Sequence, residues 1–108
     1  MKSFQDKVAA ITGAGSGIGR ALAENLAAAG CNVALADVNA RGLDETARSL
    51  ATHGVKVTKQ VLDVADRAAV FAWAEAVARD HGRVNMVFNN AGVALSGTVD
   101  EVSIEDYE

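Results

Sequence analysis

The stretch Thr12-Gly13-Ala14-Gly15-Ser16-Gly17-Ile18-Gly19 decides the fold of this chain. The apolar run before it, residues 8–11, predicts a buried strand, and the apolar periodicity after it predicts a helix. A strand, a glycine-rich turn and a helix N-terminus together favour phosphate binding, because the first N–H groups of a helix are free and carry partial positive charge. The alternative interpretation of the loop alone is a glycine-rich turn before an ordinary helix.

The rest of the chain alternates between strand-like and helix-like segments. Apolar runs predict strands at residues 7–11, 32–36, 56–61 and 84–89. Apolar periodicity predicts helices at residues 16–29, 41–51 and 66–79, with a further helix beginning near Ser103. Ile18, Leu22 and Leu26 are spaced to form the apolar face of the first helix.

This alternation predicts an α/β fold with a parallel sheet and helices on both of its faces. A phosphate loop after the first strand favours the strand order 3-2-1-4, with the ligand at the carboxyl edge between the first and fourth strands. At 108 residues the chain is expected to form a single dinucleotide-binding domain, residues 1–108.

Composition excludes several classes of protein. A net charge of −4 leaves no basic surface for nucleic acid. Residues 1–7 lack the apolar core of a signal peptide, and no apolar run is long enough to span a membrane. The single cysteine, Cys31, rules out a disulfide framework and is expected to be a small buried hydrophobe. We therefore expect a cytoplasmic protein without nucleic-acid or membrane partners.

Asp37 follows the second predicted strand and bears on the choice of cofactor. It lies 18 residues after Gly19, near the spacing at which an acid meets an adenosine ribose. Its carboxylate could accept hydrogen bonds from both ribose hydroxyls and would repel a 2′-phosphate, which favours NAD over NADP. Arg41 lies close enough in sequence to keep NADP as a weaker alternative. Without the glycine loop, Asp37 would be a solvated acid at a strand end.

The third and fourth strands also end in polar or glycine-containing features. Asp63 could accept a hydrogen bond from an adenine amino group beside the backbone N–H of Val64, although alone it would be a turn or helix-cap residue. Asn89 and Asn90 could either tie neighbouring strand ends together or line the ligand crevice. Ala91-Gly92 would let the backbone approach a ribose or nicotinamide.

Together these motifs closely resemble the N-terminal part of the classical short-chain dehydrogenase/reductase (SDR) family, across essentially the whole chain. The resemblance implies a Rossmann-like sheet, truncated before the family's later strands, and hydride transfer between NAD and an alcohol or carbonyl. It also implies a set of cofactor-binding residues: Gly13, Ser16, Gly17, Ile18 and Gly19 at the pyrophosphate, Asp37 at the adenosine ribose, Asp63 and Val64 at the adenine, and Asn90, Ala91 and Gly92 beside the nicotinamide-side ribose.

The family's catalytic serine, tyrosine and lysine cannot be assigned to residues of this sequence. Tyr107 is its single tyrosine, and the sequence stops before a lysine four residues later. His53 and His81 stand beside glycines at predicted helix ends, where capping is expected rather than catalysis or metal binding. We therefore expect no metal site, and NAD binding without turnover by these 108 residues. A non-catalytic NAD-binding module or inactive fragment is the alternative, and a flavodoxin-like protein is disfavoured by the glycine pattern.

The expected partners are the dinucleotide and, for the parent enzyme, a small alcohol or carbonyl substrate. The fourth predicted strand has no further neighbour in this sequence, and its edge is flanked by apolar residues such as Val87 and Phe88. Because an open strand edge can pair with another chain, we expect a homo-oligomer.

Overall fold

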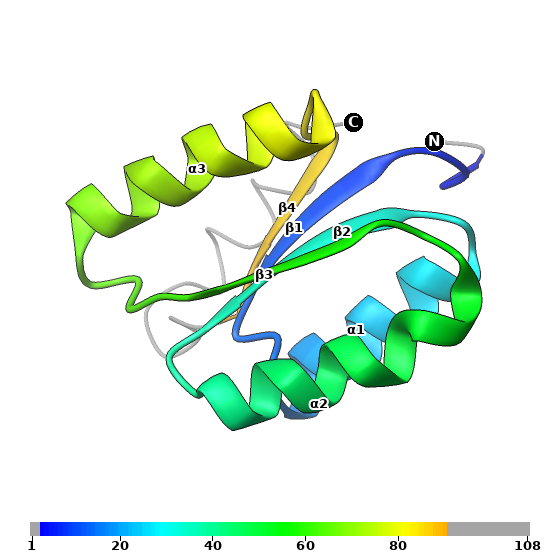
Figure 1. Ribbon diagram of the computed structural model, residues 1–108, viewed down its shortest axis with the longest axis horizontal. Coiled ribbons are helices and arrows are strands. Elements are labelled where there is room, and N and C mark those ends of the chain that lie inside the picture. The colour runs from blue at the N-terminus through cyan, green and yellow to red at the C-terminus, as the bar shows by residue number, and fades with distance from the viewer. Residues whose placement is uncertain (1–2, 91–108) are drawn as a thin grey trace.

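The computed structural model describes residues 3–90, which form one parallel sheet flanked by helices (Figure 1). The strands are β1 (Val8–Thr12), β2 (Asn32–Asp37), β3 (Val57–Val61) and β4 (Met86–Asn89). The helices are α1 (Gly17–Ala28), α2 (Ala40–Leu50) and α3 (Arg67–His81), with a short 3₁₀ turn at Ala51–His53. The strand order is β3-β2-β1-β4, which confirms the predicted topology. The helix predicted near Ser103 lies outside the described residues.

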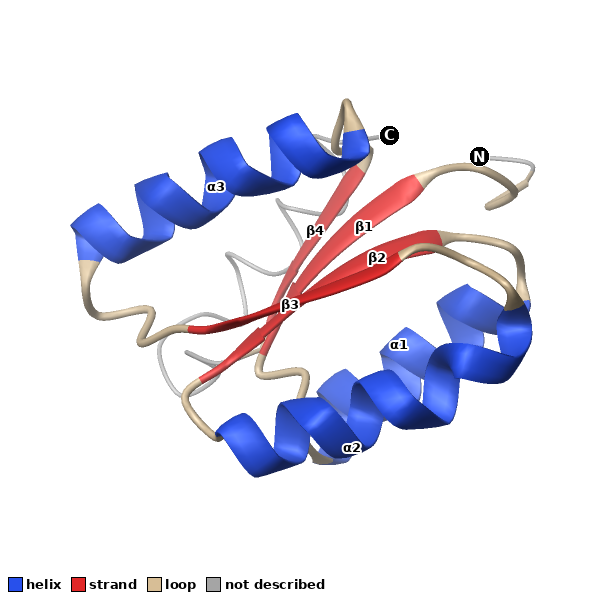
Figure 2. Cartoon of the chain, viewed as in Figure 1, coloured by secondary structure: helices blue, strands red, loops and turns tan. Residues whose placement is uncertain are grey.

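The sheet separates two apolar layers. Figure 2 shows α1 and α2 on one face and α3 on the other. Because side chains alternate along a strand, Ile11 and Leu35 pack on the α1/α2 face, while Ala10 and Ala34 pack on the α3 face. The small alanines leave room for Trp73 of α3, which is buried against them.

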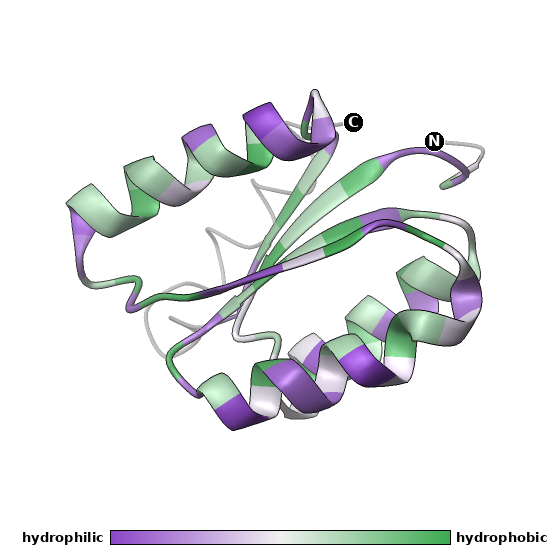
Figure 3. Cartoon of the chain, in the orientation of Figure 1, coloured by the Kyte–Doolittle hydropathy of each residue, from purple (hydrophilic) through white to green (hydrophobic). Residues whose placement is uncertain are grey.

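Hydropathy follows this layering. Figure 3 shows hydrophobic residues along the central strands, whereas the edge strand β3 carries hydrophilic positions at Lys59 and Gln60, both exposed. Cys31 is fully buried in the α1/α2 layer, and burial raises the pKa of its thiol to about 11, as expected of a structural hydrophobe. No helix within residues 3–90 combines the length and apolar character needed to cross a bilayer.

The parallel register sets the edge at which the strands end. Thr12 at the end of β1 lies opposite both Ala36 of β2 and Asn89 of β4. Asp37 at the end of β2 lies opposite Val61 of β3. The carboxyl ends of all four strands therefore lie at the same edge of the sheet.

Local capping explains where the helices begin and end. The Asn39 side chain accepts a hydrogen bond from Gly42 N at 3.1 Å at the start of α2. Asp66 accepts from Ala69 N at the start of α3, and Gly82 ends that helix in the left-handed conformation.

The predicted apolar face of α1 is wrong at one position. Ile18 is 75% exposed, and the buried face consists of Gly19, Ala23, Leu26 and Ala27. Relative to the predicted face, α1 is rotated about its axis so that Gly19, which has no side chain, packs directly on the backbone of Gly13. Ile18 is thereby turned away from the core.

His81 makes a contact that the capping interpretation did not include. Its Nε2 lies 2.8 Å from Thr58 Oγ1 of β3, and its Nδ1 is buried without a partner in the described structure. Desolvation, followed by the positive charge of Lys56, lowers the pKa of His81 from 6.5, against a smaller opposing effect of Asp80.

The lowered pKa of His81 predicts acid sensitivity. Above the unfolded-state pKa of about 6.5, His81 is neutral in both states and its burial carries no penalty for charge. As the pH falls from 6.5 through the lowered folded-state pKa, the unfolded state takes up a proton first, and the free energy of unfolding decreases. Between about pH 7.5 and pH 5, the melting temperature of the chain should fall more than that of His81→Gln, whose amide does not titrate. Parallel pH profiles of the two proteins would contradict this assignment.

Candidate cofactor site

A cavity of about 410 Å³ lies at the carboxyl ends of the strands, within the size range of small-ligand sites. It brings together most of the predicted site residues: Gly13, Ser16, Ile18, Gly19, Asp37, Asp63, Val64 and Asn90. Val38 and Leu62 also line it, and sequence reasoning did not include them. Gly17 is not part of the lining, and Ala91 and Gly92 lie outside the described residues.

The glycine loop needs its glycines for two different reasons. Gly13 and Gly17 have φ angles of 65° and 58°, a region that side chains with a Cβ rarely adopt. At Gly19 the reason is space, because an added Cβ would lie 2.7 Å from Gly13 C and closer still to Gly13 O. The loop is therefore folded back tightly onto the first turn of α1.

The N-terminus of α1 is open to an anion. The N-cap residue Ser16 makes no side-chain capping bond, and the first turn of α1 contains no acidic residue. The first N–H groups of a helix have no intrahelical partner, so this end keeps its partial positive charge. Ser16 and Ile18, both exposed, line the cavity beside it.

Asp37 is held in place at the opposite side of the loop. Its Oδ2 accepts a hydrogen bond from Gly15 N at 2.8 Å, and its Oδ1 accepts one from Asn39 N at 3.0 Å. A carboxylate has about four acceptor positions, so each oxygen keeps capacity for a ligand hydroxyl. The chain thus presents a fixed carboxylate next to a helix N-terminus.

Asp63 and Val64 follow β3 on the same edge. Asp63 is exposed, and its Oδ1 accepts from Ala65 N at 2.9 Å in a local turn. Leu62 N donates to Asp37 O at 2.9 Å, which ties this turn to the end of β2. The turn interpretation of Asp63 therefore holds, and the residue still lines the cavity.

The two asparagines at the end of β4 have the two different roles suggested for them. Asn89 ties strand ends together, since its Oδ1 accepts from Thr12 Oγ1 at 2.9 Å. Asn90 lines the cavity, and its Nδ2 is buried without a hydrogen-bond partner in the described structure. A buried amide donor without a partner costs free energy, and a ligand acceptor in the cavity would remove that cost.

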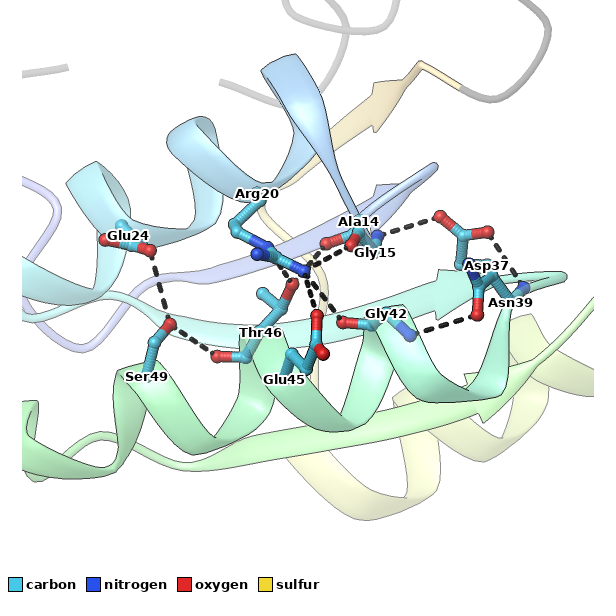
Figure 4. A network of polar contacts seen from close by, with 10 residues as sticks. All are labelled: Ala14, Gly15, Arg20, Glu24, Asp37, Asn39, Gly42, Glu45, Thr46 and Ser49. Carbon is cyan, nitrogen blue, oxygen red and sulfur yellow. Dashed lines mark hydrogen bonds and ion pairs between the residues drawn. The ribbon is translucent and has the colours of Figure 1, made fainter.

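Arg20 and Thr46, which sequence reasoning missed, hold the loop from behind (Figure 4). Arg20 Nη2 donates to Gly15 O at 2.6 Å, and Thr46 Oγ1 donates to Ala14 O at 2.8 Å. The sequence contained one indication of this role for Arg20. A cation in the first turn of a helix interacts unfavourably with the helix dipole, so its presence there suggests a specific contact elsewhere. The indication for Thr46 was its polar side chain between Leu43 and Leu50 on the buried face of α2.

The site therefore combines an electropositive helix end, two carboxylates at neighbouring strand ends and a free amide donor. This arrangement matches an anionic group flanked by hydroxyl and amino groups. Within residues 3–90, no three His, Cys, Asp or Glu side chains gather as a metal site requires.

The family described as short chain dehydrogenase matches residues 7–108. The chain belongs to this family. The match includes the glycine loop, Asp37 and the segment after β4, so it covers every part of the cavity described above.

Several known proteins resemble the chain over most of its length. One is "Putative oxidoreductase SadH" of Mycobacterium tuberculosis (strain ATCC 25618 / H37Rv), to which this chain is 51% identical over 108 residues. The alignment covers 100% of this chain and 39% of SadH. A short-chain dehydrogenase/reductase from Burkholderia phymatum in complex with NAD has a TM-score of 0.81 at 42% identity, covering 93% of this chain and 38% of that one. The NADPH-dependent 3-quinuclidinone reductase from Rhodotorula rubra has a TM-score of 0.74 at 41% identity, covering 80% of this chain and 33% of that one.

The chain thus spans between a third and two fifths of the length of these relatives. A relative in complex with NAD and an NADPH-dependent relative both share the fold. The choice between the two cofactors must therefore rest on individual side chains.

Proposed function

We propose that residues 1–108 are the cofactor-binding domain of an NAD(H)-dependent oxidoreductase that interconverts an alcohol and a carbonyl. The observation that carries the proposal is the juxtaposition, in one cavity, of the uncapped α1 N-terminus and the fixed Asp37 carboxylate. A pyrophosphate fits the first group and ribose hydroxyls fit the second. When bound, the nicotinamide would supply the hydride chemistry.

Each predicted residue then has a separate task. Gly13, Gly17 and Gly19 shape the loop so that Ser16 and Ile18 can meet the pyrophosphate. Asp37 would accept hydrogen bonds from the adenosine ribose, and Asp63 with Val64 would contact the adenine. Asn90, with Ala91 and Gly92 after it, would approach the nicotinamide-side ribose.

We propose NAD rather than NADP as the cofactor because of charge. Asp37 would face a 2′-phosphate with like charge, and Arg20, a nearby cation, already donates to Gly15 O, Gly42 O, Thr46 and Glu45. Three further points stay predictions: the carbonyl or alcohol substrate, the cytoplasmic location and self-association. Self-association is supported by the open edge of β4, which within residues 3–90 pairs only with β1.

Titration of the 108-residue chain with NADH and with NADPH tests the proposal. We expect saturable enhancement of NADH fluorescence, clearly weaker binding of NADPH, and no sustained alcohol-dependent NADH production. Absence of NADH binding by a folded chain would refute the cofactor assignment. Steady turnover would refute the expectation that these 108 residues bind NAD without catalysing the reaction.

A further inference from the structure

We propose that Thr46 and Arg20, which together form a clamp behind the glycine loop, are positioning residues: Thr46 sets the selectivity of the site for NAD over NADP, and Arg20 sets the affinity common to both cofactors. This inference rests on the proposed function. The two residues lie behind the loop and are absent from the cavity lining, so they would act through the loop backbone rather than by contact with the cofactor.

The first step concerns the direction of the hydroxyl proton of Thr46. Arg20 Nε lies 2.9 Å from Thr46 Oγ1, and a guanidinium can only donate, so Thr46 must accept this bond. The single proton of the hydroxyl is then available for Ala14 O, 2.8 Å away. Thr46 is fully buried, so water does not compete for either bond.

The second step concerns the peptide groups that carry these carbonyl oxygens. In a trans peptide the C=O and the following N–H point in opposite directions. The bond from Thr46 to Ala14 O therefore orients the Gly15 N–H, which donates to Asp37 Oδ2 at 2.8 Å. In the same way, the bond from Arg20 to Gly15 O turns the Ser16 N–H away from the clamp.

The third step is the tight fit between the loop and α2. A Cβ on Gly42 would lie 2.6 Å from Gly15 O, and a Cβ on Gly15 would lie 2.9 Å from Asp37 Oδ2. Loop, carboxylate and helix are thus in direct contact, as Figure 4 shows. Asp37 cannot rotate freely without breaking its bond to Gly15, so its charge stays where a 2′-phosphate would arrive.

The consequence differs for the two residues. Loss of the Thr46 hydroxyl releases the Gly15 peptide and lets Asp37 turn away from a 2′-phosphate, which weakens NADH binding and relieves repulsion of NADPH. Loss of the Arg20 guanidinium removes the hydrogen bond to Gly15 O and so disturbs the orientation of the Ser16 N–H. This N–H would contact the pyrophosphate, which both cofactors contain. Thr46 therefore controls the ratio of the two affinities, and Arg20 controls their common level.

The test measures dissociation constants for NADH and NADPH in the 108-residue chain and three variants. Thr46→Val removes the hydroxyl at similar volume, and the NADPH-to-NADH ratio of dissociation constants should fall about tenfold, the value of one hydrogen bond to a charged group. Thr46→Ser keeps the hydroxyl and should restore the ratio. Ser49→Ala, which removes a hydroxyl one turn further along α2 that bonds Thr46 O and Glu24, should leave it unchanged.

The outcomes separate this inference from the proposed function. Parallel weakening of both cofactors by Thr46→Val, with an unchanged ratio, would mean that the clamp is merely structural and would overturn the inference. Failure of the unmodified chain to bind NADH would instead count against the proposed function. If Thr46→Val does not fold, Thr46→Cys, whose thiol is a weak donor of similar size, is judged by the same criterion.

Discussion

Replacing Gly19 with alanine is expected to abolish dinucleotide binding and to lower the free energy of unfolding by about 3 kcal/mol. The new Cβ would lie 2.7 Å from Gly13 C and 3.1 Å from Ala14 Cα, and closer still to Gly13 O. All three atoms belong to the backbone, which cannot rotate aside as a flexible side chain can. The loop would have to separate from α1, and the N–H groups that should meet the pyrophosphate would move with it.

Gly54→Ala is the matched control for this substitution. Gly54 has a positive φ of 72°, unlike Gly19, and an added Cβ there would meet nothing within 4 Å. It should cost about 1 kcal/mol of backbone strain and leave NADH binding unchanged. Urea unfolding and NADH titration measure both quantities, and near-normal NADH affinity in Gly19→Ala would show that the loop does not hold the pyrophosphate.

Replacing Asp37 with alanine is expected to weaken NADH binding at least about tenfold and to bring NADPH affinity level with it or above it. The substitution removes two charge-assisted acceptors for ribose hydroxyls and also the like charge that would oppose a 2′-phosphate. The unpartnered Gly15 N–H would in addition loosen the loop. Parallel titrations with NADH and NADPH give the ratio of affinities.

Two further variants separate the charge of Asp37 from its hold on the loop. Asp37→Asn keeps an oxygen acceptor for Gly15 N but removes the charge, so it should relax selectivity with less loss of NADH affinity. Asp44→Ala removes an exposed carboxylate of α2 that pairs with Lys59 away from the cavity, and should change neither affinity. Unchanged selectivity in Asp37→Ala would show that Asp37 is not the ribose ligand.

Much of this architecture was predictable because its signals are local. The apolar runs identified the strands, and the ends of α3 at Asp66 and Gly82 depend on capping bonds and conformations of only a few neighbouring residues. The strand order followed from the phosphate loop after the first strand, by the rule for ligand sites in open parallel α/β sheets. The same rule placed the ends of all four strands on one edge, and with them the predicted site residues.

The errors and omissions arise where distant segments meet. The exposure of Ile18 depends on how closely Gly19 packs on Gly13, which a helical periodicity of apolar residues does not contain. Val38 and Leu62 join the cavity because β2 and β3 end side by side. Asn89 and Asn90, adjacent and identical in type, differ in role because only Asn89 faces Thr12 across the sheet.

The amino-acid sequence was enough to predict the alternation of strands and helices, the strand order and the sheet edge that carries most of the candidate site residues, because these depend on local periodicity and on general rules of parallel sheets. How the glycine loop is held became visible in the folded chain alone. Arg20, Gly42 and Thr46 come from two helices that strand β2 separates along the chain, and their contacts with the loop exist only once α1 and α2 pack side by side on the same face of the sheet. Hydrogen bonds and close backbone contacts form between groups that are near in space. The separation of those groups along the chain does not indicate that they will meet.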